Sequence, residues 1–281
     1  MSKKQVPSRT PVCLTVAGLD PSGGAGILAD VRTFSRFGCF PAAVASSVTF
    51  QNTIGVFGAV HQSADSVRRQ MEPVLDDYDV AAVKTGMLPT AEIIAEVARL
   101  IESKILKNIV VDPVVRSTSG YDLIDDGALA VLVEKLFPRA DIVTPNIPEA
   151  ERICKMKIGT TADIDRAAEI MLSMGAKSVL IKGGHGLPGE KPSAVDYLFI
   201  AGSSPLIFEG AYIDSNATHG TGCVLSAAIA ANLALGQDVA DAVRISKGFV
   251  AEAIRTAPHL GRGHSPINID HFAGVKIDGD R

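Results

Sequence analysis

The sequence is poor in cysteine. Its 281 residues contain four, and no two of them have the C-x-x-C spacing of a structural zinc site. Their wide separation is typical of reduced thiols rather than of a disulfide framework. The four are Cys13, Cys39, Cys154 and Cys223. The six histidines add no zinc-ligand pattern, because His259 and His264 lie in a tail rich in proline and glycine with no cysteine nearby. We therefore predict no zinc site.

Long hydrophobic runs and an excess of basic charge are also missing. No stretch approaches the ~18 apolar residues of a membrane span, and no apolar segment of a secretion signal follows the basic N-terminus. The formal net charge of -4 gives no general basic face for nucleic acid. We expect a soluble, cytoplasmic protein that binds neither membranes nor nucleic acid.

What the sequence does contain is apolar material for a core. Hydrophobic residues make up 47% of the chain and charged residues 21%, so the chain can bury a sizeable core and is not disordered. No linker-like shift in composition and no internal repeat divides it. We predict a single domain over residues 1–281, with flexible residues at 1–11.

Strand-like and helix-like patterns alternate along most of the chain. Short apolar or β-branched runs, which look buried on both faces, predict strands at residues 13–18, 42–50, 80–86, 108–113, 141–146 and 178–184. Helical periodicity predicts helices at 24–37, 65–76, 90–104, 126–137, 147–154, 162–175, 222–235 and 238–256. This alternation indicates an α/β fold with a mostly parallel sheet covered by helices. Residues 194–213 predict an antiparallel hairpin at the sheet edge.

Ligands of such sheets bind beyond the carboxyl ends of the strands. The first segment there, "AGLDPSGGAGILAD" (17–30), has three glycines that open a helix and expose N–H groups at its positive end. It has neither the Lys-Ser/Thr ending of a P-loop nor a G-x-G-x-x-G pattern, so a tight turn without a ligand is an equal alternative. Taken alone, Asp30 in this helix is interpreted as a carboxylate exposed to solvent on the helix face.

Two further strand ends carry side chains that suit a flat ring. Gln51 follows a strand, and its carboxamide can pair with a heteroaromatic ring that offers an amino group beside a ring nitrogen. Met87, in "KTGMLP", offers a thioether that can pack on such a ring. Taken alone, a turn amide and a core methionine are the simpler interpretations.

Acidic residues after two more strands indicate a magnesium site. Asp112 lies in "VVDPV" and Glu149 in "TPNIPEAE", and magnesium uses few carboxylates while it bridges substrate phosphates. The alternatives are a turn at Asp112 and a helix start stabilised by Glu149. Finally, "IKGGHG" (181–186) ends a strand with three glycines, which suits close approach to a nucleotide or a plain turn.

The strongest single feature is "THGTGCVLSAAIAA" (218–231). Gly220 and Gly222 bracket Thr221 ahead of a buried helix, whose first N–H groups would surround an anion and neutralise a phosphoryl group during transfer. Cys223 lies in the first turn, where we expect the helix dipole to lower the pKa of its thiol and favour the thiolate. A plain buried cysteine is the alternative. A serine hydrolase is disfavoured, because the chain has no G-x-S-x-G elbow.

Together these segments resemble the ribokinase superfamily, and within it the hydroxymethylpyrimidine/phosphomethylpyrimidine kinases of thiamine biosynthesis. The matching strings, in order, are "AGLDPSGGAGILAD", "QNTIGV", "KTGML", "VVDPV", "TPNIPEAE", "IKGGHG", "THGTGCVLSAAIAA" and "GRGHSPIN". The resemblance implies a three-layer sandwich with a mostly parallel central sheet, helices on both faces and an antiparallel edge hairpin, in a homodimer. It also implies phosphorylation of an aminopyrimidine and then of its monophosphate, with ATP, magnesium and, as an option, potassium.

The resemblance also implies a role for each matched residue. For catalysis they are Cys223, as base or positioning group, and an anion hole of Gly220, Thr221 and Gly222. For the pyrimidine they are Gln51, Gly18, Asp30 and Met87. For the nucleotide and its phosphates they are Asn146, Lys182, Gly183, Gly184, His185 and Gly186. For magnesium they are Asp112 and Glu149.

Two alternatives stay open. A pyridoxal kinase of the same branch would accept a similar flat ring with a hydroxymethyl group, although Gln51 suits the aminopyrimidine edge better. A ligand-binding relative that lost phosphoryl transfer is disfavoured, because the glycine turn, the acidic pair and the thiol are all present.

Overall fold

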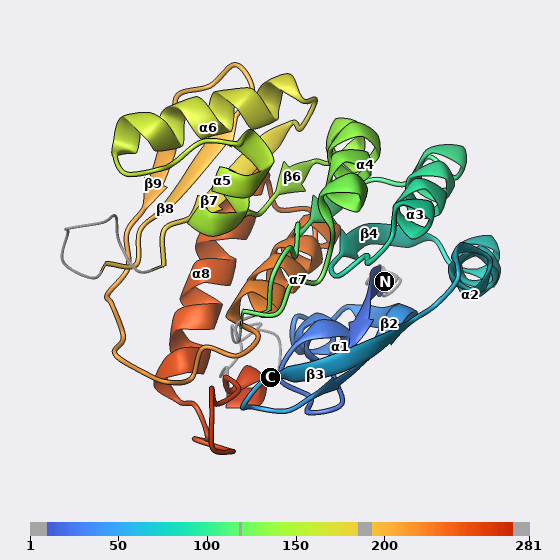
Figure 1. Cartoon of the computed structure of the whole chain (residues 1–281), viewed down its shortest axis with the longest axis horizontal. Helices are drawn as coiled ribbons and strands as arrows, with labels where there is room; N and C mark the ends of the chain where they lie inside the picture. Colours follow the sequence, from blue (N-terminus) through green and yellow to red (C-terminus); the bar gives the residue numbers. More distant parts are fainter. Residues whose placement is uncertain (1–9, 118–119, 185–192, 272–281) are drawn as a thin grey trace, which may run out of the picture.

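The computed structural model describes residues 10–117, 120–184 and 193–271 (Figure 1). The strands are β1 (Val12–Leu19), β2 (Phe40–Gln51), β3 (Val56–His61), β4 (Val80–Thr85), β5 (Ile109–Val111), β6 (Ile142–Val143), β7 (Ser178–Lys182), β8 (Asp196–Ile200) and β9 (Leu206–Phe208). The α-helices are α1 (Gly26–Arg36), α2 (Ala64–Asp77), α3 (Ala91–Ser103), α4 (Asp126–Leu136), α5 (Ile147–Cys154), α6 (Thr161–Ser173), α7 (Thr221–Ala234) and α8 (Val239–Arg255). The predicted flexible segment 1–11 lies outside the described residues, apart from its last two positions.

All of these strands belong to one sheet, in the order β3-β2-β1-β4-β5-β6-β7-β8-β9. The run from β2 to β7 is parallel, while β3 at one edge and β8 and β9 at the other are antiparallel. The parallel sheet and the hairpin predicted over 194–213 are confirmed. Strand β3 was not predicted. Its side chains are half-buried or exposed, so the sequence has no buried apolar run there.

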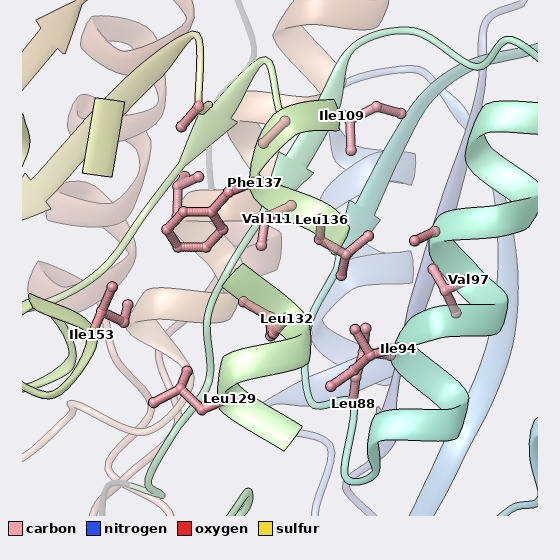
Figure 2. Close-up of a cluster of buried hydrophobic side chains, with 14 of the residues drawn as sticks. Leu88, Ile94, Val97, Ile109, Val111, Leu129, Leu132, Leu136, Phe137 and Ile153 are labelled. Carbon is pink, nitrogen blue, oxygen red and sulfur yellow. The ribbon is translucent and has the colours of Figure 1, made fainter. Parts of the chain in front are cut away.

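The sheet separates two helical layers, so the fold has three layers (Figure 1). Helices α2 to α6 bury their apolar faces against one side, and α1, α7 and α8 against the other. Figure 2 shows part of the first layer, where side chains of α3 and α4 meet beside Val111 of β5. Burial of this apolar surface is the main force that holds the layers together.

The helices start in two different ways, and the difference positions the site. Six have a side-chain cap that accepts an N–H of the first turn, from Ser63, Thr90, Asp125, Asn146, Thr160 and Asp238. Helices α1 and α7 have no side-chain cap and begin after Ala25 and Gly220. Their first N–H groups therefore have no side-chain cap, and those of Gly26 and Thr221 bond instead to the thiol of Cys223 and to the carbonyl oxygen of Thr218. All eight predicted helices are present, with ends within two residues of the prediction.

Candidate active site

A cavity of about 1820 Å³ lies at the carboxyl ends of the parallel strands. Its wall includes Gly18 of β1, Gln51 of β2, Lys84 of β4 and Lys182 of β7, together with Asp112 just after β5. The uncapped starts of α1 and α7 also line it. This is the place where open α/β sheets bind their ligands.

The glycine turn before α7 depends on the left-handed conformation of Gly220. Gly220 has a φ of 82°, a left-handed conformation that favours glycine, and a Cβ there would lie 1.8 Å from the carbonyl oxygen of Gly24. Thr221 holds the turn, since its hydroxyl donates to the carbonyl oxygen of Thr218 over 3.1 Å. Gly220, Thr221 and Gly222 all line the cavity, as an anion hole requires.

A lysine and two carboxylates face this turn. The Nζ of Lys182 donates to Oδ1 of Asp112 over 3.2 Å and lies 3.9 Å from Oε2 of Glu149. The hydroxyl of Ser226, on α7, donates to the other oxygen of Asp112 over 3.1 Å. A Cβ on Gly222 would lie only 3.3 Å from the Nζ of Lys182. Lys182 therefore lies beside the glycine turn.

The two carboxylates have different proton affinities. Burial would raise the pKa of Asp112, but the charges of Lys182 and Lys84 outweigh it and hold this pKa below its ordinary value. Burial raises the pKa of Glu149 to about 7, against the charge of Lys182 and with a further rise from Asp112. Asp112 is therefore ionised at neutral pH, while Glu149 is divided between its two forms.

These carboxylates fit a magnesium ion that also binds phosphate. The described residues contain no group of three or more His, Cys, Asp or Glu side chains that could hold a metal. Two carboxylates suit an ion whose other ligands are phosphate oxygens and water. Glu149 also forms a capping box with Asn146 at the start of α5, so the helix-start interpretation of Glu149 is confirmed too. Because backbone N–H groups of Asn146 and Val115 already bind this carboxylate, a contact through water fits it best.

Cys223 lies in the first turn of α7 and lines the cavity. The backbone N–H of Gly26, at the start of α1, hydrogen bonds to its thiol. Burial raises the pKa of Cys223 to about 11, and Lys84 is the main group that opposes this rise. The prediction of a lowered thiol pKa is therefore wrong for the free protein, because desolvation outweighs the favourable position at the helix start.

Lys84 is a site residue that the sequence analysis did not single out. Its Nζ donates to Oδ2 of Asp30 over 2.8 Å, and both side chains are fully buried. The hydroxyl of Thr15 donates to the same oxygen over 2.6 Å. Asp30 is thus no solvated carboxylate, and it lies beneath the cavity wall rather than in it, with Lys84 between. The sequence feature that could have identified Lys84 is a lysine within an otherwise apolar strand.

Three of the predicted pyrimidine residues come together at one end of the cavity. Gln51 is the last residue of β2, Gly18 is one residue before the end of β1, and Met87 follows the end of β4. A Cβ on Gly18 would lie 3.0 Å from the sulfur of Met87, so the two are in close contact. An amide and a thioether thus share one wall region, which suits a flat polar ring.

A hydrogen-bonded carboxylate, also missed from the sequence, connects this end to the glycine turn. Oδ2 of Asp20 lies 2.8 Å from Nε2 of His219, the residue before Gly220. Burial would raise the pKa of Asp20, but hydrogen bonds from the side chains of His219, Ser22 and Gln51 lower it to about 2. Asp20 therefore stays ionised and holds both Gln51 and the turn in place.

The opposite end of the cavity has another buried charge pair. Lys247 of α8 donates to Oδ2 of Asp196 over 2.5 Å, and the N–H of Gly183 donates to Oδ1 of the same carboxylate over 3.1 Å. Gly184 and Asn146 line the cavity nearby. The predicted nucleotide residues at positions 185 and 186 lie outside the described residues.

The three-layer sandwich and the cavity at its strand ends define an α/β kinase of the ribokinase-like class. The B. subtilis pyridoxal kinase, solved as an ADP complex, is 35% identical and has a TM-score of 0.84, with 92% of this chain and 97% of that chain covered. Pyridoxal kinase from Staphylococcus aureus, with AMP-PCP and pyridoxal, is 29% identical at a TM-score of 0.84, with 93% and 94% covered.

Within this class, the chain belongs to the phosphomethylpyrimidine kinase family, whose model matches residues 20–268. It is 42% identical to the hydroxymethylpyrimidine/phosphomethylpyrimidine kinase of Bacillus subtilis (strain 168) over 92% of this chain and 94% of the relative. It is also 42% identical to the solved phosphomethylpyrimidine kinase of Clostridium difficile 630, at a TM-score of 0.77 over 87% of this chain and all of that chain. The resemblance stated from the motifs is confirmed.

Proposed function

We propose that the protein uses ATP to phosphorylate 4-amino-5-hydroxymethyl-2-methylpyrimidine and then its monophosphate, for thiamine biosynthesis. Family membership supports this activity, together with the names of the relatives that cover nearly the whole chain. The observation that carries it within the molecule is one cavity that joins Gln51 and Met87 to Cys223 and the glycine turn.

In this proposal the pyrimidine lies against Met87 at the Gln51 end of the cavity. The oxygen of the Gln51 amide accepts from the ring amino group, and its NH2 donates to the neighbouring ring nitrogen. Asp20 holds this amide, which limits its rotation. The hydroxymethyl group of the ring then faces Cys223.

Phosphoryl transfer takes place in front of the glycine turn. The hydroxymethyl oxygen forms a bond to the γ-phosphorus of ATP, the bond from that phosphorus to the ADP oxygen breaks, and the hydroxyl proton passes to the sulfur of Cys223 in its thiolate form. The N–H groups at Gly220 to Gly222 and the ammonium of Lys182 neutralise charge on the phosphoryl oxygens. Asp112 and, through water, Glu149 would hold the magnesium ion, which supplies further positive charge there.

The test is a kinase assay with hydroxymethylpyrimidine, its phosphate and pyridoxal side by side, with magnesium or potassium omitted in turn. We expect turnover of both pyrimidines and a far lower kcat/KM for pyridoxal. A preference for pyridoxal would replace the proposal by the alternative that the neighbouring pyridoxal kinase structures represent. ATP consumption at background with all three would support a ligand-binding relative.

We further propose a single cytoplasmic domain that acts as a homodimer. The edge hairpin of β2 and β3 exposes Phe50, Phe57 and Val60, which are 53%, 68% and 54% exposed. An apolar edge strand of this kind is a surface that proteins cover by association. The described residues include no helix long and apolar enough to cross a membrane. Light scattering of wild type and Phe57→Ser tests the dimer, and a monomeric wild type would contradict it.

A further inference from the structure

The ion pair of Lys84 and Asp30 has no part in the chemistry proposed so far. Both side chains are fully buried, and Oδ1 of Asp30 has no hydrogen-bond partner among the described residues. A buried ion pair of this kind adds little to stability, because the loss of hydration offsets much of the attraction. An unpaired carboxylate oxygen makes this cost larger. The pair therefore calls for a functional explanation.

The pair lies near Cys223, because α7 packs against both α1 and β4, which carry Asp30 and Lys84. Gly26, whose N–H binds the thiol, and Asp30 are four residues apart on α1, so they lie on the same face of that helix. Lys84 reaches from β4 to Asp30 and also lines the cavity. A Cβ on Gly86 would lie 2.8 Å from the Nζ of Lys84, so the backbone of Gly86 packs closely against this buried ammonium.

Charged groups from four elements act on the thiol. After burial, Lys84 has the largest effect on the pKa of Cys223 and lowers it, while Asp30 and Asp112 raise it. Lys182 also interacts with a charged Cys223, from the end of β7. Burial would lower the pKa of Lys84, but Asp30, Cys223 and Asp112 outweigh burial and raise it, so Lys84 stays cationic.

We propose that Lys84, anchored by Asp30, is a positioning residue whose fixed charge stabilises the thiolate of Cys223. The thiol first releases its proton to water, and the ammonium of Lys84 balances the negative sulfur. The thiolate can then take the proton of the substrate hydroxyl while the oxygen attacks phosphorus. Asp30 holds the ammonium of Lys84 in place. It also weakens the effect of Lys84 on the thiol, because the negative charge of Asp30 disfavours the thiolate. The catalytic use of the thiolate rests on the proposed function, whereas the stabilisation of the thiolate by Lys84 does not.

The experiment measures iodoacetamide alkylation of Cys223 in the full-length protein without substrate, from about pH 7 to about pH 10, because only the thiolate reacts. Three forms are compared: wild type, Asp30→Asn, and Asp30→Asn with Lys84→Met. Peptide mass spectrometry locates the label, and Cys223→Ala in each background gives the blank from the other cysteines.

The two variants are expected to change the rate in opposite directions. Asp30→Asn leaves Lys84 without its opposing charge and should speed alkylation by about tenfold, equal to about one pKa unit. The double variant lacks both charges and should react about tenfold more slowly than wild type, since the lysine effect is the larger of the two. Thr15→Val, which removes a hydrogen bond to Asp30 but keeps both charges, should stay within about twofold.

Equal rates in all forms, or a change in the same direction in both variants, would overturn the proposal. If Asp30→Asn does not fold, the double variant decides alone, because it leaves no unpaired charge buried. The alkylation needs neither ATP nor pyrimidine. A failed kinase assay would therefore reject the proposed function without touching this result, and the reverse also holds.

Discussion

Two lysine–aspartate pairs lie at the reactive end of the cavity. Lys84 and Asp30 are both sealed, with side chains 0% exposed, whereas Lys182 and Asp112 are 14% and 3% exposed at the cavity wall. The chemistry of the two pairs is the same, but their access to ligand differs. The sealed pair can act on a ligand only through its electrostatic field. The open pair can exchange the contact between its lysine and aspartate for a contact with phosphate or metal.

Small differences at the strand ends produce this contrast. Lys182 is the last residue of β7, whereas Lys84 is one residue before the end of β4. Lys84 therefore points from within the sheet toward α1, where Asp30 accepts its hydrogen bond and is itself held by Thr15 of β1. Lys182 emerges at the edge beside Glu149 and the glycine turn. The first position is suited to electrostatic tuning and the second to charge neutralisation during transfer.

The largest expected effect is on the sealed pair. Lys84→Met alone should lower the free energy of unfolding by about 3–5 kcal/mol, because Asp30 remains buried without its partner. Urea denaturation at neutral pH measures this loss. Adding Asp30→Asn should recover most of it, since the second change removes the unpaired charge. A double variant as unstable as the single one would show that packing, and not charge, sets the stability of this region.

The open pair should show its effect in catalysis instead. Lys182→Met should lower kcat by about 10²–10³, as expected for loss of one preorganised charge that faces the transferred phosphoryl group. Steady-state kinetics with saturating pyrimidine measures the change. The control is Lys177→Met, which removes an exposed lysine that pairs with Asp141 outside the cavity. If Lys182→Met keeps kcat within threefold of this control, the open pair has no role in transfer.

Cys223 interacts electrostatically with the lysines of both pairs, and its removal tests whether both act on one proton transfer. Cys223→Ala should lower kcat by about 10²-fold, the lower end of the range for a general base. Cys223→Asp should restore part of this rate, because a carboxylate can take the same proton. Near-normal kcat in Cys223→Ala would leave the thiol with a role in shaping the cavity only, and Lys84 with no catalytic target.

The sequence was sufficient to predict almost the whole fold, because each helix has an apolar face at helical spacing and each parallel strand has a short apolar run. It failed at β3, which has no buried run, and at residues whose role depends on a distant partner. Lys84 meets Asp30 across 54 positions, and Asp20 meets His219 across 199. No local pattern contains such pairings. The thiol pKa was predicted in the wrong direction for a related reason, since desolvation depends on what packs around Cys223 rather than on its place in the helix.

The smallest effect expected is a pH dependence that comes from Glu149, which lies beside Lys182 of the open pair. Because the pKa of Glu149 is raised to about 7, its carboxylate is lost as the pH falls through 7, while Asp112, with its lowered pKa, stays ionised. At one unit below that value about a tenth of Glu149 is ionised, so half-maximal activity should require up to about tenfold more magnesium. Glu149→Gln should need more magnesium at every pH and lose this dependence. A wild-type magnesium requirement that is flat from about pH 6 to about pH 8 would separate Glu149 from the metal and leave Asp112 as the carboxylate that matters there.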